Sequence, residues 1–122
     1  MTKLEWNESR SGLNEAIEAV RDKKAADITV LDLRGGAAFT DHFLICSGSN
    51  PRQIQAISDE ISRRLGIMGL QPLHVEGYNH AEWVLMDYVD FVVHIFSERA
   101  RSFYDLERLW RTARRIPVQS VS

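Results

Sequence analysis

The sequence predicts an α/β fold in which a mixed sheet of about five strands is flanked by helices. Helical and strand-like patterns alternate along the chain, and residues 50–69 form a clear amphipathic helix between two strand-like runs. Residues 83–97 contain two more runs rich in aromatic and β-branched side chains, with almost no gap between them. This order of elements is typical of a domain in which helices pack against a sheet.

Length and composition indicate one globular domain. The chain has 122 residues, of which 44% are hydrophobic and 26% charged, which is enough for one core. We expect a loose N-terminal leader at residues 1–10, a single domain at 11–116 and a C-terminal tail at 117–122. The polar N-terminus lacks the features of a signal peptide, and no apolar run approaches the roughly 20 residues of a membrane span. We therefore expect a cytoplasmic protein with no membrane partner.

The N-terminal part of the chain is predicted to form a helix followed by two strands. Leu13, Ile17 and Val20 recur at helical spacing, which predicts a helix over residues 11–24. Residues 26–33 and 39–47 are apolar and rich in β-formers, and each run ends at glycine, so both are predicted strands.

The helix that begins after Asn50 has the strongest local signals. Asn50 is a favourable N-cap, Pro51 suits the first helical position, and Gln53 stands where a capping-box partner stands. Its apolar stripe consists of Ile54, Ile57, Ile61, Leu65 and Met68. Because another strand-like run follows at residues 73–76, the pattern suggests a right-handed crossover and a parallel pair of strands.

The C-terminal third is predicted to be a hairpin and a last helix. Residues 83–88 and 91–97 form the antiparallel hairpin, and the second run is apolar on both faces, as in a central strand. The last helix is expected to start near Ser102. Its apolar side chains, which we expect to pack inward, are Phe103, Leu106, Leu109 and Trp110.

The residues give no specific support for catalysis or for a bound cofactor. Cys46 lies in an apolar run, which indicates a buried core thiol. His74 and Glu76 would share a strand face, but the histidines match no compact metal-ligand motif. Gly48-Ser49 before a helix resembles the opening of a nucleotidyltransferase motif. The next acids, Asp59-Glu60, are adjacent in mid-helix and cannot face one magnesium site together.

Charge and aromatic content favour a protein partner. The formal net charge is −2, from 15 Lys and Arg against 17 Asp and Glu, whereas RNA-binding domains normally carry a basic excess. We therefore expect no dominant nucleic-acid contact. On the strand at residues 83–88, Trp83 and Asp87 point one way and Tyr88 the other. Trp and Tyr are favoured interface anchors, although they also serve as core aromatics.

Two motifs carry a resemblance to a known family. The first is Trp83-x-x-x-Asp87-Tyr88-x-Asp90-x-Val92-Val93-His94-x-Phe96, and the second is Arg101-x-Phe103-Tyr104-x-Leu106-Glu107-x-Leu109-Trp110. Together with upstream segments over residues 11–111, they resemble the Iojap family of ribosomal silencing factors. The chain departs from the family pattern at two positions. His42 stands where the family often has Tyr or Cys, and Val89 stands where glycine is usual. A β-branched residue at Val89 is costly if that position needs a positive φ.

The resemblance implies a nucleotidyltransferase-like fold without catalytic acids. It also implies binding to ribosomal protein number fourteen of the large ribosomal subunit, which sterically blocks joining of the small subunit and represses translation. It further implies a homodimer as the form of the free protein. The partner-binding residues implied are Trp83, Asp87, Tyr88, Glu76, Gly77, His94, Arg101 and Tyr104, with Thr40, Asp41, Ser47 and Gly48 as weaker candidates.

Two other classes of function stay open at this point. One is a nucleotide-binding or nucleotidyltransferase-related enzyme, suggested by the Gly48-Ser49 turn. The other is a self-associating structural protein built on the apolar hairpin. Magnesium-dependent nucleotide binding would favour the first, and the state of association at micromolar concentration tests the second.

Overall fold

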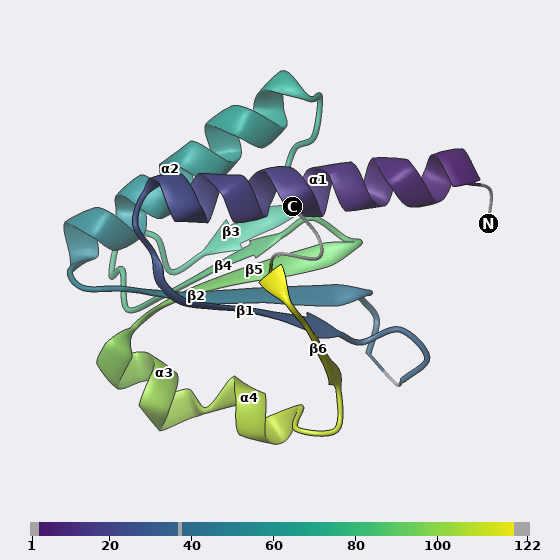
Figure 1. Ribbon diagram of the computed structural model, residues 1–122. Helices are drawn as coiled ribbons and strands as arrows, with labels where there is room; N and C mark the ends of the chain where they lie inside the picture. Colours follow the sequence, from purple (N-terminus) through teal and green to yellow (C-terminus); the bar gives the residue numbers. More distant parts are fainter. Residues whose placement is uncertain (1–2, 37, 119–122) are drawn as a thin grey trace.

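The protein is a three-layer α/β sandwich built on one six-stranded mixed sheet (Figure 1). The computed structural model describes residues 3–36 and 38–118. Helices α1 and α2 cover one face of the sheet, and α3 and α4 lie on the other. In chain order the elements are α1 (Lys3–Asp22), β1 (Ala26–Asp32), β2 (His42–Gly48), α2 (Pro51–Ile67), β3 (His74–Glu76), β4 (Trp83–Asp87), β5 (Phe91–Ser97), α3 (Glu98–Tyr104), α4 (Leu106–Leu109) and β6 (Arg114–Ile116). The predicted α/β architecture is confirmed, with six strands rather than about five.

The sheet has the order β3-β4-β5-β2-β1-β6. The predicted β4–β5 hairpin and the central position of β5 are confirmed. The expected parallel partner was wrong: β2 runs parallel to β5, while β3 pairs antiparallel with β4 at the sheet edge. All three residues of β3 are exposed, whereas residues 91–96 of β5 are buried. The interior position beside β2 therefore goes to the strand that is apolar on both faces.

The sixth strand, β6, was not predicted from the sequence. β6 pairs antiparallel with β1, with Ile116 opposite Val30. Ile116 is only 6% exposed and joins the core beside Val30. Arg114 also approaches Asp32, at 3.7 Å. This short segment is therefore held at the sheet edge by the burial of one isoleucine and by three residue pairs with β1.

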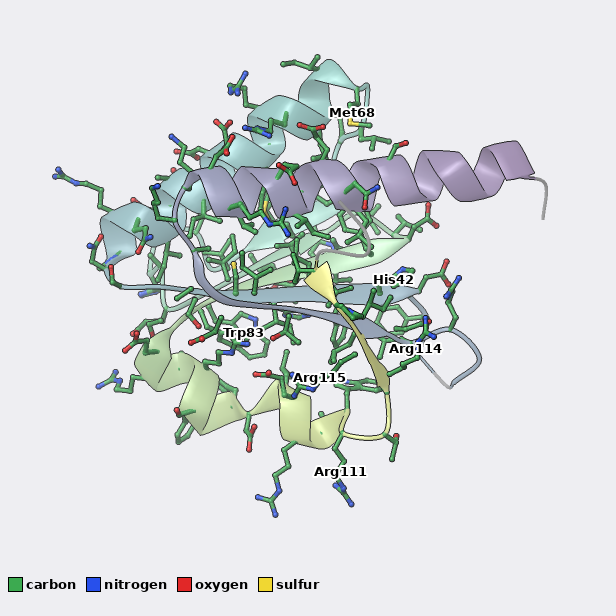
Figure 2. All side chains as sticks on the ribbon, in the orientation of Figure 1. His42, Met68, Trp83, Arg111, Arg114 and Arg115 are labelled. Carbon is green, nitrogen blue, oxygen red and sulfur yellow. The ribbon has the colours of Figure 1, made fainter. Side chains whose placement is uncertain are left out.

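Two cores lie on opposite faces of the sheet. The larger core packs α1 and α2 against β2, β4 and β5, and the smaller one packs α3 and α4 against β1, β2 and β5. The stripe predicted on α2 is buried at Ile54, Ile57, Ile61 and Leu65. Met68 was wrongly included, because it follows the end of the helix as the C-cap and is 42% exposed (Figure 2).

The predicted cap of α2 is confirmed at Asn50, whose Oδ1 accepts from Gln53 N at 2.8 Å. The reciprocal bond is shifted by one residue, since Gln53 Oε1 accepts from Ser49 N at 2.6 Å rather than from Asn50. Gln53 Nε2 also donates to the carbonyls of Lys23 and Lys24, both at 3.1 Å. One side chain therefore joins the start of α2 to the end of α1.

The chain ends differ from the predicted boundaries. Helix α1 begins at Lys3, so residues 3–10 are helical, and the expectation of a loose leader was wrong for them. Of the predicted tail at 117–122, residues 119–122 lie outside the described residues.

The last helix is two short helices separated by Asp105. Ser97 caps α3, with its Oγ accepting from Ala100 N at 3.1 Å, so this helix starts earlier than predicted. Asp105 then takes a left-handed conformation with φ 48°, which ends α3 and turns the chain. Leu106 and Trp110 pack against the smaller core as expected. The expectation was wrong for Phe103 and Leu109, which are 79% and 71% exposed.

Candidate partner-binding site

One face of the β3–β4 edge is only partly covered. Trp83, Leu85 and Asp87 are half-buried on the side of α3, while the alternate residues of β4 are fully buried under α2. Helix α3 packs against β5 and β2, farther into the sheet. In β3, His74 lies opposite Asp87 and Glu76 opposite Leu85, so they share this face. We call His74, Glu76, Trp83, Leu85 and Asp87 the open sheet face.

Trp83 anchors one end of this face through a cluster of rings. Its ring centroid lies 4.6 Å from that of Tyr104 and 5.0 Å from that of Phe96. Its indole Nε1 donates a hydrogen bond to His94 Nδ1 at 3.1 Å. Tyr104 is 51% exposed and extends the aromatic surface onto α3. A half-buried Trp beside an exposed Tyr is the kind of surface that anchors protein partners.

His94 is buried and neutral. It is 3% exposed, and burial lowers its pKa to about 4. Because Nδ1 accepts from Trp83, the proton of the neutral ring is on Nε2. That nitrogen has no hydrogen-bond partner among the described residues. His94 therefore orients Trp83 from below and does not reach the surface itself.

Arg101 connects α3 to strands β1 and β2. Its guanidinium donates to Ser47 Oγ at 2.9 Å, to Thr29 Oγ1 at 3.2 Å and to Glu107 Oε1 at 2.9 Å. The hydrogen bond from Arg101 is the main reason that the pKa of Glu107 is lowered. Arg101 thus fixes the helix that carries Tyr104, and it uses Ser47, one of the weaker candidates, to do so.

The other end of the open sheet face is polar. His74 Nε2 lies 3.1 Å from Glu76 Oε2, as their predicted shared face requires, and His74 Nδ1 lies 4.0 Å from Asp87 Oδ2. The Glu76 side chain is 71% exposed, whereas that of Asp87 is 14% exposed. Among residues 11–36 and 38–118, whose side chains the structure describes, no group of three His, Cys, Asp or Glu side chains could hold a metal ion.

Gly77 has a steric role. Its φ is 83°, and a Cβ built there would lie 2.0 Å from the carbonyl oxygen of Trp83. Its own carbonyl accepts from Ala81 N at 3.0 Å. Only glycine allows the loop to approach the start of β4 this closely, so Gly77 helps to position Trp83.

The hairpin turn contains Val89 with φ 74°, the costly conformation expected if this position needs a positive φ. Asp90 N donates to Tyr88 O at 2.9 Å, which closes a three-residue turn around Val89. Asp87 Oδ1 accepts from Val89 N at 2.8 Å, and Thr40 Oγ1 donates to Val89 O at 2.9 Å. Asp87 and Thr40 therefore hold a strained turn.

Tyr88 lies apart from the other candidates. It is 9% exposed in the larger core, and its ring stacks on Phe91 at 5.2 Å. Burial is the main cause that raises its pKa. The structure thus brings together Trp83, His94 and Tyr104 at one end, with Glu76 and Asp87 at the other. Arg101 instead contacts β1, β2 and Glu107. Leu85 was not chosen from the sequence, although its shared strand parity with Trp83 and Asp87 was a usable signal.

Cys46 and Gly48 serve the packing of the domain. Cys46 is fully buried, and desolvation raises the pKa of its thiol to about 12, as expected for a core residue. A Cβ at Gly48 would lie 2.6 Å from Ile54 Cγ1. Gly48 therefore allows close packing between the end of β2 and α2.

The fold has solved counterparts. A crystal structure of a protein from Chromobacterium violaceum superposes with a TM-score of 0.79 at 33% identity, covering 82% of this chain and 83% of that one. A structure from Bacillus halodurans has a TM-score of 0.77 at 39% identity, covering 86% and 95%.

Three sequence relatives carry names that refer to the ribosome. A protein named Ribosomal silencing factor RsfS from Bacillus subtilis is 44% identical, over 85% of this chain and 88% of the relative. One of the same name from Halalkalibacterium halodurans is 39% identical, over 89% and 93%. A mouse protein named Mitochondrial assembly of ribosomal large subunit protein 1 is 27% identical, over 77% of this chain and 42% of that protein.

Fold and site together define an α/β domain with an aromatic and acidic surface along one sheet edge. No helix within the described residues is long and apolar enough to cross a membrane. The family described as "Ribosomal silencing factor during starvation" matches residues 7–122. The chain belongs to this ribosomal silencing factor family, a family of regulatory, ribosome-associated factors.

Proposed function

We propose that this protein binds the large ribosomal subunit through ribosomal protein number fourteen and thereby sterically blocks joining of the small subunit, which represses translation. Family membership supports the regulatory role, and the names of the relatives point to the ribosome and its large subunit. The observation that carries the proposal is the open sheet face, where Trp83 is held in one orientation beside an exposed Tyr104.

The chemistry of this face suits a protein partner with apolar and cationic groups. At one end, the Trp83 and Tyr104 rings supply rigid contact area at low entropic cost. At the other end, the exposed Glu76 carboxylate offers a rim charge for steering and orientation. Gly77, His94 and Arg101 act through positioning, and Tyr88 contributes core stability to the hairpin.

Retention of purified large subunits tests the proposal. Asp87 is a poor choice for charge reversal because its carboxylate accepts from Val89 N. The variant of choice combines Glu76→Arg with Tyr104→Ala, since both side chains are exposed. Glu18→Arg is the control: it makes the same charge change on α1, in the opposite layer (Figure 1), and its only ion pair among the described residues is with Arg21 on the same helix.

The wild type and the control are expected to retain large subunits and no small ones. The double variant should bind about tenfold more weakly or worse, the size expected when an aromatic anchor is lost. If the double variant retains large subunits like the wild type, the open sheet face is not the contact. If the wild type retains neither subunit, the proposed function is wrong.

Two further expectations stay predictions. The homodimer implied for the free protein is tested by sedimentation velocity at micromolar concentration. The cytoplasmic location follows from the proposed function and is tested by fractionation. The alternative of a nucleotide-binding enzyme gains no support from Asp59 and Glu60. Asp59 accepts from Tyr78 OH at 2.9 Å, and Glu60 pairs with Arg63 and Arg64 at 2.7 and 2.8 Å.

A further inference from the structure

The net charge of −2 conceals an uneven distribution. Residues 98–115 contain six arginines and only three carboxylates, so this segment carries about +3 and the rest of the chain about −5. The six are Arg99, Arg101, Arg108, Arg111, Arg114 and Arg115. They belong to α3, α4, the segment that follows α4, and β6, so the positive charge gathers on one side of the sandwich (Figure 1). Figure 2 shows Arg111, Arg114 and Arg115 around the α4–β6 end of the molecule.

Three of these arginines form ion pairs within the protein. Glu107 pairs with Arg101 at 2.9 Å and with Arg115 at 3.4 Å. Arg114 lies 3.7 Å from Asp32.

The other three, Arg99, Arg108 and Arg111, are exposed and form no ion pair with any described residue. The local excess therefore resides in side chains that are free to meet an external anion.

An exposed aromatic ring lies among these arginines. Phe103, which is 79% exposed, lines two neighbouring hollows. The first, of about 420 Å³, is also lined by Arg99 and Glu82. The second, of about 430 Å³, is also lined by Arg108, Arg111 and one carboxylate, that of Asp105. A large apolar ring is thus exposed to water with arginines on both sides. Neither the packing of the core nor the open sheet face requires this exposure.

We propose that this arginine–phenylalanine face (Arg99, Phe103, Arg108 and Arg111) binds a single-stranded segment of RNA. Guanidinium groups make bidentate hydrogen bonds to phosphate. An exposed aromatic ring stacks a splayed base without regard to its identity. Alternating cation and ring therefore match the alternating phosphate and base of a single strand, whereas an acidic peptide would leave the Phe103 ring without a stacking partner.

This contact is additional to the proposed protein contact. Tyr104 touches both surfaces, because its ring meets Phe103 at 5.1 Å and Trp83 at 4.6 Å. One partner that presents protein and RNA side by side could therefore occupy both. The inference does not depend on the proposed function, since isolated RNA can be used to test it.

Fluorescence anisotropy with a labelled single-stranded RNA of about 12 nucleotides and mixed sequence is the direct test. The variant is Arg108→Glu with Arg111→Glu. The control is Arg52→Glu with Arg63→Glu, which makes the same charge change at exposed arginines of α2. Circular dichroism melts verify folding of the variant, which is expected because neither Arg108 nor Arg111 is in an ion pair. The control removes the ion pair between Arg63 and Glu60, so its folding is verified in the same way.

We expect the wild type to bind the RNA and the α3–α4 variant to bind at least about tenfold more weakly, with the control within about twofold. The logarithm of the wild-type affinity should fall against the logarithm of salt with a slope of about −2, for three phosphates contacted. Phe103→Ala should weaken single-stranded binding more than binding to a duplex, whose bases are already stacked.

Three results would overturn the inference. One is no RNA binding at about 50 mM salt, where electrostatic contacts are strongest. A second is an equal loss in the variant and the α2 control, which would mean that net charge alone is responsible. The third is competition by polyglutamate as strong as by unlabelled RNA, which would assign the face to an acidic polypeptide.

Discussion

The indole nitrogen of Trp83 donates a hydrogen bond to Nδ1 of His94, at 3.1 Å across the β4–β5 hairpin. This bond joins a half-buried anchor of the open sheet face to a buried imidazole. It requires the unprotonated form of Nδ1, and burial lowers the pKa of His94 to about 4, which secures that form near neutral pH. The orientation of the proposed contact residue therefore depends on a neutral core histidine.

Stability is predicted to fall as the pH falls from about 6.5 to about 4. The ordinary pKa of 6.5 applies to His94 in the unfolded chain, which therefore binds a proton in this window while the folded protein does not. A shift of this size corresponds to about 3 kcal/mol at the most. Urea unfolding between pH 7 and pH 5 captures about 2 kcal/mol of this, above the range near pH 4 in which carboxylates titrate in the unfolded chain.

His94→Gln is the control for this window. Its amide oxygen can still accept from Trp83, but it does not titrate, so the slope of stability against pH should flatten. A wild-type protein whose unfolding free energy is constant from pH 7 to pH 5 would contradict the account of His94.

Gly77→Ala is predicted to destabilise the protein severely, by about 3 kcal/mol or more. The new Cβ would lie 2.0 Å from the carbonyl oxygen of Trp83, in addition to the strain of φ 83°. Gly69→Ala is the matched control, because Gly69 has the same φ of 83° but nothing within 4 Å of the added atom. It should cost only about 1 kcal/mol. Equal losses in urea unfolding would show that the close approach to Trp83 is unimportant.

Val89→Gly is predicted to stabilise the hairpin by about 1 kcal/mol. Val89 has φ 74° and is 57% exposed, so glycine relieves backbone strain and removes little packing. The added freedom of glycine in the unfolded chain offsets part of the gain. Thermal unfolding of the two proteins measures the difference. A lower melting temperature for the glycine variant would mean that Val89 makes a contact worth more than its strain.

Local signals predicted the elements whose stability is decided locally. The N-cap at Asn50 and the stripe from Ile54 to Leu65 define α2 because caps and helical periodicity depend on residues close in sequence. The hairpin at residues 83–97 was predictable because β-branched and aromatic runs with a short gap have few other ways to pair.

Long-range choices were not predictable in the same way. Whether β3 or β5 lies beside β2 depends on burial across the whole sheet, and β6 owes its existence to Ile116 reaching Val30. The break at Asp105 had a weak local signal, because Asp tolerates the left-handed conformation. Missing that break placed Phe103 and Leu109 in the core when they are exposed.

In the candidate site, too, local patterns were predictable and long-range contacts were not. Strand parity alone put Trp83, Leu85 and Asp87 on one face and Tyr88 on the other, as the structure has them. Family resemblance added Tyr88 to the candidates against that parity, and the structure buries it in the larger core. The hydrogen bonds of Arg101 to Thr29 and Ser47 could not be predicted, since they join residues more than 50 positions apart.

Subunit joining is the most direct measurement of the central claim. Purified large and small subunits are mixed with the protein, and joined ribosomes are separated from free subunits on a sucrose gradient. The wild type and Glu18→Arg are predicted to lower the joined fraction in proportion to the protein added, and Glu76→Arg with Tyr104→Ala is predicted to leave it near the protein-free value. An unchanged joined fraction with saturating wild-type protein would contradict the silencing function, and equal inhibition by the double variant would contradict the open sheet face as its site.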